Sequence, residues 1–207
     1  AVRFGLWDPA NGSLRENDKQ LRQTVKGMVL GCGYGASAKK YAMIMKCSLE
    51  DAERSVALYQ KKMSKVIKLW KKYNRQLKLT ADSEEYRIEL PSGNAIVYRN
   101  VARGTDSLTC TLVRNGKPMV IRPWYGMITE NCSQSLARDI FCQQLTNIEN
   151  AGHKIILHVH DEVIIECAET EAQRTLDEVV KIMSTPPSWI PDIPLSAEGA
   201  ISKIYTK

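Results

Sequence analysis

The sequence predicts an α+β protein with an antiparallel sheet. Four stretches place apolar residues three and four positions apart, as amphipathic helices do. Between the second and third of them, the segment 85–126 changes to a period of two and contains turn residues, which is typical of β-hairpins. Two short apolar strands follow the third stretch and surround a polar tip. The order helices, hairpins, helix, hairpin, helix indicates an α+β fold.

The first helix is expected over about residues 17–35. The apolar positions that define it are Leu21, Val25, Met28, Val29 and Cys32. Gly31, Gly33 and Gly35 lie at the end of this stretch and favour termination of the helix there.

The second helix is expected to run unbroken over residues 48–77. It begins with Ser48 and Asp51, which resemble a capping box. Its outer face is basic, without an acid between residues 55 and 81, and consists of Lys61, Lys62, Lys65, Lys68, Lys71, Lys72, Arg75 and Lys78. Such a charge run is usually a solvated face, but a face without compensating acids also favours a neighbouring polyanion.

Two antiparallel hairpins are expected next. Strands at 87–90 and 95–99 surround a Pro-Ser-Gly-Asn turn, and strands at 108–113 and 118–121 surround an Asn-Gly pair. Asn-Gly tolerates positive φ and is a strong hairpin signal. The chain then continues into the third helix.

The third helix is expected over about residues 129–150 and the last helix over 171–183. Between them, the apolar segments 154–159 and 163–167 predict a further hairpin. The last helix has a capping-box pattern that starts at Thr170.

Composition and charge narrow the class of protein. Hydrophobic residues make up 43% and charged residues 25% of the 207 residues, which argues against a disordered or fibrous chain. No window approaches the roughly 18 apolar residues of a membrane span, and residues 1–8 lack a signal-peptide pattern, so we expect a cytoplasmic protein without a membrane partner.

The start at Ala1 favours processing or a piece of a longer protein. The net charge of +6 permits a nucleic-acid partner.

The cysteines are widely scattered. None forms a Cys-x-x-Cys pair, which argues against a zinc ribbon or a thioredoxin-like motif. Their contexts predict reduced, buried thiols at Cys32, Cys47, Cys110, Cys132, Cys142 and Cys167, as in an intracellular protein.

The first candidate site consists of Arg22, Lys26, Leu30, Tyr34 and Gly35. A spacing of four residues advances about 6 Å along a helix, so Arg22 and Lys26 share one face. Two cations one turn apart suit a chain of phosphates. An aromatic residue followed by glycine suits stacking of a base or sugar where the backbone must come close. A surface Arg and Lys followed by a Tyr-Gly cap is the plainer alternative.

His160, Asp161 and Glu162 form the second candidate site, between two apolar strands. An acid at a tight turn is exposed and rigid, as a metal ligand has to be. One carboxylate does not hold a divalent ion firmly, so an ordinary polar turn is the alternative. If strand pairing continues through the tip, Glu162 points to the opposite side from Asp161.

Together these motifs resemble the C-terminal part of the family A DNA polymerases, the bacterial DNA polymerase I family. The first matches that family's Arg-x3-Lys-x3-aromatic-x3-Tyr-Gly except at Leu30, and the second matches its His-Asp-Glu. Residues 130–139 are similar to the helix that lines the DNA, and residues 194–199 to the closing segment of phage-type members. The resemblance covers nearly the whole chain. It implies a right-hand fold with fingers helices in residues 1–79 and a palm portion in residues 80–207.

The resemblance implies template-directed DNA synthesis, in which a primer 3′-hydroxyl attacks the α-phosphate of a dNTP with two Mg²⁺ ions. Arg22 and Lys26 would bind the triphosphate, and Asp161 would hold the metal ions. Tyr34 and Gly35 would lie where the template base enters. The implied partners are dNTP and primer-template DNA, in a bacterial host or a prophage-bearing cell.

Further residues follow from the same resemblance. His160 and Glu162 would flank the primer terminus, and Gln134 would reach the minor groove of the nascent pair. Leu30 stands where most relatives place Phe or Tyr against the sugar, which changes the packing there. Glu130 stands where many bacterial members have Asn, although phage-type relatives often have an acid.

The family's other catalytic Asp belongs to an upstream motif, and nothing before Arg22 matches it. We therefore expect a fragment that needs the upstream polymerase segment, thumb and remaining palm, in cis or in trans. The alternative is that Glu162 or Asp139 takes the place of the missing catalytic Asp as a metal ligand. The alternatives are a non-catalytic DNA-binding remnant, one half of a split polymerase, and a purely structural basic domain. Leu30-Gly31 and Glu162 argue against a single-subunit RNA polymerase.

Overall fold

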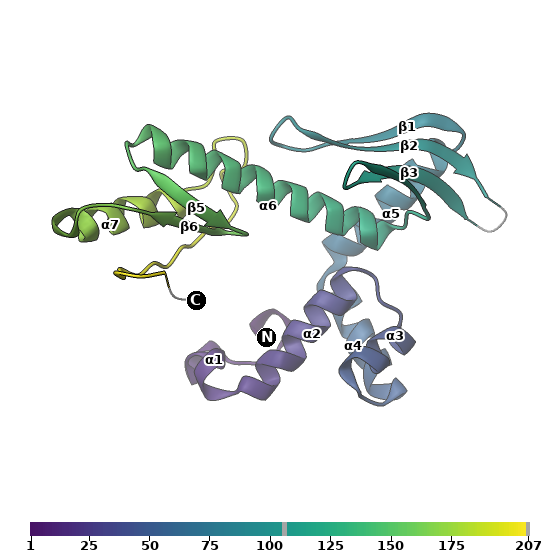
Figure 1. Ribbon diagram of the computed structural model, residues 1–207. Helices are drawn as coiled ribbons and strands as arrows, with labels where there is room; N and C mark the ends of the chain where they lie inside the picture. Colours follow the sequence, from purple (N-terminus) through teal and green to yellow (C-terminus); the bar gives the residue numbers. More distant parts are fainter. Residues whose placement is uncertain (105–106, 206–207) are drawn as a thin grey trace. The chain divides into compact units, whose positions relative to one another are not determined.

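The chain divides into two compact units in the computed structural model, which describes residues 1–104 and 107–205. The first unit contains residues 1–87 and 97–131, and the second contains residues 88–96 and the chain from residue 132 onward. Figure 1 shows the helices and strands of both units. Helices together with antiparallel strands confirm the expected α+β class.

Helices form most of the first unit. Their bounds are Val2–Phe4 (η1), Pro9–Asn11 (η2), Leu14–Asn17 (α1), Lys19–Gly33 (α2), Ala38–Met45 (α3), Leu49–Lys62 (α4) and Ser64–Leu79 (α5). The first expected helix is confirmed as α2, whose start is capped by Asp18: the carboxylate accepts from the backbone N–H of Leu21 at 2.8 Å. The sequence pattern does not predict α3, because eight residues are too few for a clear period. Helices α2, α3 and α4 pack against one another (Figure 1).

The expected unbroken helix over residues 48–77 is wrong, because α4 and α5 meet at Met63. The φ of −108° and ψ of 39° at Met63 end α4 and precede α5. Neither glycine nor proline marks this position, so the apolar stripe continues across it without a sign of the break. Ser48 is confirmed as the cap of α4: its Oγ accepts from the backbone N–H of Asp51 at 3.1 Å. The Asp51 carboxylate accepts from the Ser48 hydroxyl at 2.6 Å, rather than from the Ser48 backbone N–H as in a capping box.

A series of aromatic rings forms the core of the first unit. Ring centroids lie 6.2 Å apart between Phe4 and Tyr59 and 6.4 Å apart between Tyr59 and Trp70. Trp70 lies 4.8 Å from Tyr125, at the start of α6 (Tyr125–Asn150). The other members of this buried cluster are Val25, Met28, Cys32, Tyr41 and Ala52. Because aromatic side chains bury the largest apolar areas, these rings hold η1, α4, α5 and α6 together.

One four-stranded sheet contains both of the expected hairpins. Its strands pair in chain order and are Ser83–Glu89 (β1), Ala95–Arg103 (β2), Leu108–Arg114 (β3) and Lys117–Ile121 (β4). The Asn-Gly turn is confirmed, since Asn115 and Gly116 have φ of 51° and 73°. Tyr98 and Cys110 are buried in the sheet, and the side-chain amide of Asn131 in α6 donates to the Tyr98 hydroxyl at 2.7 Å.

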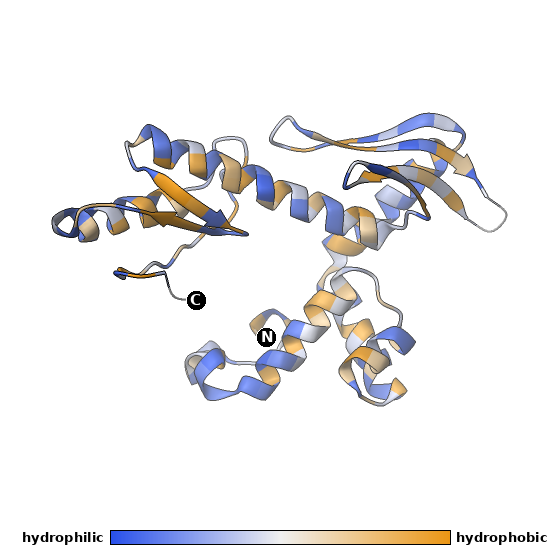
Figure 2. Cartoon of the chain, in the orientation of Figure 1, coloured by the Kyte–Doolittle hydropathy of each residue, from blue (hydrophilic) through white to orange (hydrophobic). Residues whose placement is uncertain are grey.

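The second unit contains most of α6 and a two-stranded hairpin, whose strands are Ile155–Val159 (β5) and Glu162–Ile165 (β6). Its remaining helices are Glu169–Glu171 (η3) and Ala172–Met183 (α7). The third expected helix is confirmed, although α6 begins at Tyr125 rather than near residue 129. The expected last hairpin is also confirmed, and both of its strands are strongly hydrophobic in Figure 2.

In the second unit, α6 and α7 each bury apolar side chains. The buried apolar side chains of the two helices are Ile140, Phe141, Ile148 and Val179. The buried amide of Gln144 donates to the carbonyl of Met183 at the end of α7. The capping box expected at Thr170 is wrong: Glu171 precedes α7, and no side chain caps its start. Among the described residues, no helix has both the length and the apolar composition that crossing a membrane requires.

The cysteines differ in exposure. Cys32 and Cys110 are buried as expected, and burial raises the pKa of each thiol to about 11. The expectation of burial is wrong for Cys142 and Cys167, which are exposed. Cys142 lies on the outer side of α6 and Cys167 follows β6, so neither reaches an apolar core.

We expect Cys142 and Cys167 to react quickly with iodoacetamide at pH 8, and Cys32 and Cys110 to react only after unfolding. Burial excludes the reagent, and a pKa of about 11 leaves almost no thiolate at that pH. Peptide mass spectrometry after short pulses measures the modified fraction of each thiol. Rapid labelling of Cys32 in the folded protein would contradict the packing of α2 against the core.

Candidate functional site

The outer face of α2 presents the first group of candidate residues. Val25, Met28 and Cys32 are buried on the aromatic core, so the opposite side of the helix faces outward. Lys26 is exposed there, and Arg22, one turn earlier, is half-buried. Leu30 is 49% exposed, which leaves an apolar surface beside the cations.

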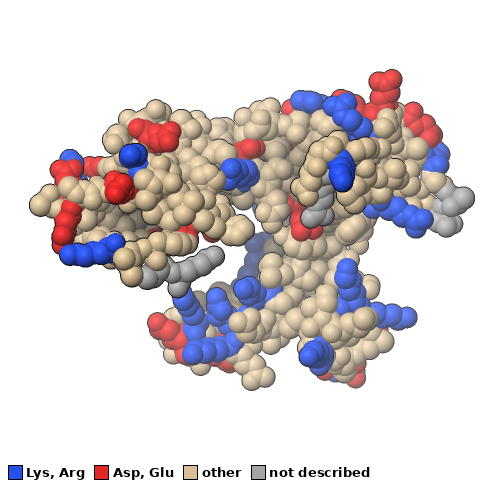
Figure 3. All heavy atoms as spheres, in the orientation of Figure 1, with Lys and Arg blue, Asp and Glu red and all other residues tan. Residues whose placement is uncertain are grey.

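A shallow pocket lies at the start of α2. It has a volume of about 490 Å³ and is lined by Arg15, Glu16, Lys19, Arg22 and Gln23. Basic side chains gather over α1 and the beginning of α2 in Figure 3. With three cations and one carboxylate, the pocket is suited to an anion. Arg15 and Lys19 were not among the expected site residues. Lys19 lies three residues before Arg22 on α2, a helical spacing that could have indicated it, whereas Arg15 lies on the separate helix α1.

The end of α2 is fixed by close contact with the start of α6. Tyr34 caps the helix, and Gly35 follows with φ of 76°. A Cβ at Gly35 would lie 2.5 Å from the ring of Tyr125, and a Cβ at Gly126 would overlap the backbone oxygen of Tyr34. Gly35 therefore allows the ring of Tyr125 to come close to the backbone, and the expected approach of a base or sugar there stays a prediction. Sequence reasoning missed Tyr125 and Gly126, whose only signal is an aromatic-glycine pair far along the chain.

The tip of the β5–β6 hairpin presents the second group. Val159 pairs with Glu162, which leaves His160 and Asp161 as a two-residue turn. His160 has φ of 56°, a left-handed conformation that is uncommon outside glycine but enriched for histidine. All three residues of the tip, His160, Asp161 and Glu162, are exposed. Because strand pairing stops at Glu162, the strand alternation considered for Asp161 does not apply.

The hairpin is positioned by α6 within the second unit. The ring of His158 in β5 contacts the ring of Phe141 edge to face, with centroids 5.9 Å apart. His158 thus faces the helix, and the turn residues extend beyond the strands. Gln134 is exposed on α6 in the same unit. Glu130, half-buried on α6, belongs to the first unit.

The carboxylates of the described residues do not make a complete metal site. Within the described part of the chain, no group of three or more His, Cys, Asp and Glu side chains is arranged to hold a metal ion. Asp139 is engaged elsewhere: its carboxylate accepts from the Ser92 hydroxyl and, at 2.8 Å, from the Asn94 amide. It therefore holds the β1–β2 turn against α6, which argues against Asp139 as a substitute ligand. Asp161 fits a hard cation as one ligand of a larger set.

Comparison with known proteins supports the resemblance to DNA polymerases. No protein-family model matches the chain. The chain is 28% identical over 214 residues to a DNA polymerase of Bacillus phage SP02, an alignment that covers 90% of this chain and 33% of the relative. Its fold is similar to the POL domain of Pol1 from M. smegmatis, solved in complex with DNA primer-template and dNTP. That match has a TM-score of 0.63 and 23% identity, and covers 89% of this chain and 30% of the other. The chain thus spans about a third of the length of both proteins.

We expect Gly126→Ala to lower the free energy of unfolding by about 2 kcal/mol or more, because the new methyl group overlaps the Tyr34 backbone. Gly33→Ala is the matched control at the end of α2, where a Cβ would lie 3.5 Å from the Tyr59 hydroxyl. The control should change stability by less than about 1 kcal/mol. Thermal unfolding followed by circular dichroism compares the two, and equal stabilities would contradict the contact.

We expect Asp139→Ala to destabilise the protein by about 1–3 kcal/mol, because the Ser92 hydroxyl and the Asn94 amide lose their acceptor. Asp177→Ala is the control, since that carboxylate accepts from Gln173 on an exposed helix face, at 2.8 Å. An exposed pair of this kind contributes about 0.2–0.5 kcal/mol. Chemical unfolding measures both variants. A loss no larger for Asp139 than for Asp177 would refute its role in holding the turn.

Proposed function

We propose that this chain is the fingers-and-palm part of a family A-like DNA polymerase. The reaction is transfer of a nucleotidyl group from dNTP to a primer 3′-hydroxyl. The main support is the outer face of α2, where Arg22 and Lys26 lie one turn apart in a chain 28% identical over 90% of its length to a phage DNA polymerase. Fingers extend to about residue 79, and the palm portion follows from residue 80.

Arg22 and Lys26 bind the triphosphate of the incoming nucleotide in this proposal. The guanidinium group can donate two parallel hydrogen bonds to one phosphate, while the ammonium group acts as a compact charge. Since negative charge moves onto the pyrophosphate as the bond breaks, both cations stabilise the transition state more than the ground state. Their mounting on a helix that is buried on its other side keeps this geometry rigid.

Asp161 is the proposed metal ligand on this chain. Mg²⁺ is commonly held by one or two carboxylates together with substrate phosphates. When bound, the ion would offset negative charge on the reacting phosphates. The exposed turn leaves the Asp161 carboxylate accessible to such a complex. A second carboxylate would come from the other part of the polymerase.

The remaining site residues contact the nucleic acid in this proposal. Tyr34 borders the position of the template base, and Gln134 reaches the minor groove of the nascent pair. His160 and Glu162 flank the primer terminus. Leu30 contacts the sugar through its exposed aliphatic surface in place of an aromatic ring.

The partners follow from the same assignment. They are dNTP, primer-template DNA and the thumb and remaining palm, supplied in cis or in trans. The reaction would take place in the cytoplasm of a bacterial host or prophage-bearing cell. The second candidate function is a non-catalytic DNA-binding remnant, which the basic, acid-free surface of α5 favours.

We expect Lys26→Gln to weaken binding of a fluorescent dNTP in the presence of Mg²⁺ by about 10- to 100-fold, the effect of losing one hydrogen bond from a charged donor. The control is Lys39→Gln, which removes an equally exposed ammonium from α3. Fluorescence anisotropy measures both. Equal affinities for the two variants would contradict the proposed triphosphate site.

Primer extension then separates the enzyme from the remnant. The chain is mixed with the rest of the SP02 phage polymerase, supplied as a separate polypeptide, on a primed template with four dNTPs. Extension that Asp161→Ala abolishes supports the catalytic assignment. Extension that survives Asp161→Ala refutes the metal-ligand role. Duplex binding without any extension favours the remnant or a different polymerase half.

A further inference from the structure

We propose that α5 is a docking surface for the phosphate backbone of duplex DNA, bound without regard to base sequence. The surface consists of its six cations, called here the α5 basic face: Lys65, Lys68, Lys71, Lys72, Arg75 and Lys78. All six side chains are exposed. The choice of DNA as the polyanion rests on the proposed function, whereas the surface itself is defined by the charges of the helix.

Helical geometry places these cations on one side of α5. At about 100° per residue, the six cations occupy a sector of about 140° and extend about 20 Å along the axis. The buried residues Trp70, Tyr73 and Leu77 occupy the opposite side. In B-DNA, about 20 Å of axis contains about six phosphates on one strand. The α5 basic face is therefore matched in length and number of charges to one duplex backbone.

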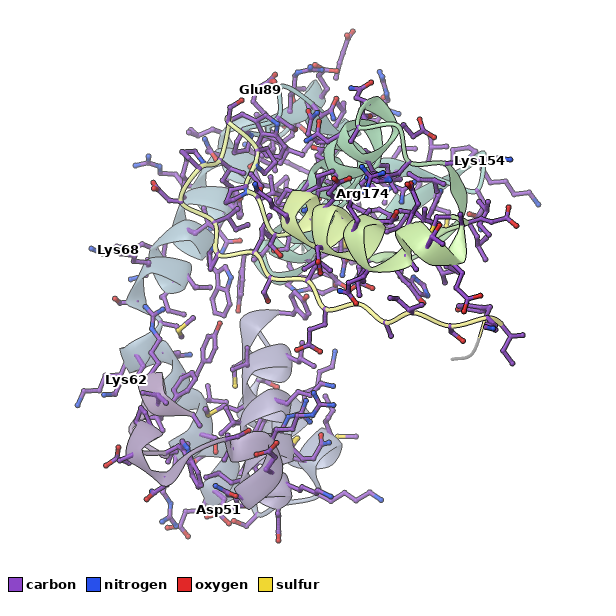
Figure 4. The ribbon with its side chains drawn as sticks, turned by 90° about the vertical axis from the view of Figure 1, so that its left-hand side faces the viewer. Asp51, Lys62, Lys68, Glu89, Lys154 and Arg174 are labelled. Atoms are coloured by element: carbon purple, nitrogen blue, oxygen red, sulfur yellow. The ribbon has the colours of Figure 1, made fainter. Side chains whose placement is uncertain are left out.

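Lys68 shows the orientation of this face in the side-chain view. Its side chain points away from the body of the first unit (Figure 4). Lys62, at the end of α4, points outward on the same side and extends the row of charge across the break at Met63. The break at Met63 therefore does not interrupt the row of basic residues, and Lys62 and Lys68 point to the same side.

The α5 basic face lies in a stretch of the sequence that has no acidic residue. The sequence contains no Asp or Glu from residue 54 to residue 81, and the first turn of α5 has no acid. Throughout the described residues, no ion pair to any of the six cations is present. Arg54, Arg103 and Arg174, in contrast, each pair with a carboxylate. Like charges three or four residues apart destabilise a helix, so this face is one that a polyanion would stabilise.

The chemistry of the face favours a duplex over a single strand. Single-strand sites combine cations with exposed aromatic rings on which bases stack. The aromatic residues of α5, Trp70 and Tyr73, are 7% and 8% exposed and lie in the core. Five of the six cations are lysines, flexible point charges that contact phosphates without reading base edges. A surface that offers positive charge without exposed aromatic rings therefore suits the regularly spaced phosphates of duplex DNA.

Neutralisation of the face tests the proposal in the whole chain. Lys65→Gln, Lys68→Gln and Lys72→Gln are combined in one variant. The control combines Lys39→Gln, Lys117→Gln and Lys181→Gln, three exposed lysines of α3, β4 and α7. Both variants lose three charges, so a difference between them reports position. Fluorescence anisotropy with a labelled blunt 25-base-pair duplex and with the corresponding single strand, from 50 to 200 mM salt, gives affinity and salt dependence.

We expect the α5 variant to lose at least tenfold in duplex affinity at 50 mM salt. The slope of log affinity against log salt should fall by about 2–3, since each phosphate contact contributes about 0.9. The control should keep most of its slope and its unfolding midpoint. The α5 variant should unfold at the parent midpoint or above it, because it loses repulsion between like charges. Equal losses in both variants, or undetectable duplex binding by the parent chain, would overturn the proposal. A larger loss for the single strand than for the duplex would also overturn it.

The dNTP assay separates this proposal from the proposed function. The α5 variant should bind labelled dNTP as the parent chain does, because no residue of the α5 basic face belongs to the α2 site. If the parent chain binds no dNTP while the α5 variant alone loses duplex affinity, the polymerase assignment fails and the docking surface stands. If dNTP binding depends on Lys26 while the α5 variant and its three-lysine control bind the duplex equally, the docking surface fails and the polymerase assignment stands.

Discussion

The stacked rings of Phe4, Tyr59, Trp70 and Tyr125 are the contact on which the first unit depends. They connect four separate elements, and the inner face of α2 packs on the same cluster. Because that face is buried, the side with Lys26 has to point outward. Tyr125 also contacts Gly35, so one aromatic ring both completes the core and sets the end of the helix that bears the candidate site.

Local signals in the sequence were sufficient where one or two residues determine a conformation. Asn115 and Gly116 require positive φ and form the expected turn, and Ser48 caps α4 as its pattern indicates. The break at Met63 could not be predicted, since the apolar stripe is the same on both sides of it. The contact between Gly126 and Tyr34 could not be predicted either, because it joins residues far apart in the chain and depends on packing rather than on periodicity.

Within the candidate site, too, local patterns predicted some residues, and only the structure revealed the roles of others. Spacing along one helix was enough to place Arg22 and Lys26 near each other, and the turn with Asp161 followed from its flanking strands. The sequence predicted a three-residue tip there, whereas the structure pairs Glu162 with Val159 and leaves two residues. Arg15 and Lys19 entered only through the pocket at the start of α2. Asp139 shows the opposite case: a carboxylate that sequence alone leaves open for metal binding is engaged in holding a turn. The partners of Asp139, Ser92 and Asn94, lie more than 40 residues earlier in the chain, so no local pattern encodes them.

The concentration of charge on α5 gives salt two opposite effects on the same molecule. Without DNA, dissolved ions screen the repulsion among the six cations, so the free first unit becomes more stable as salt rises. In the proposed complex with DNA, those ions would compete for the phosphates, and the complex would become weaker. The conditions that preserve the isolated chain best would therefore be those under which it binds DNA least. At low salt, a bound duplex would take over the screening and act as the stabilising counterion of the helix.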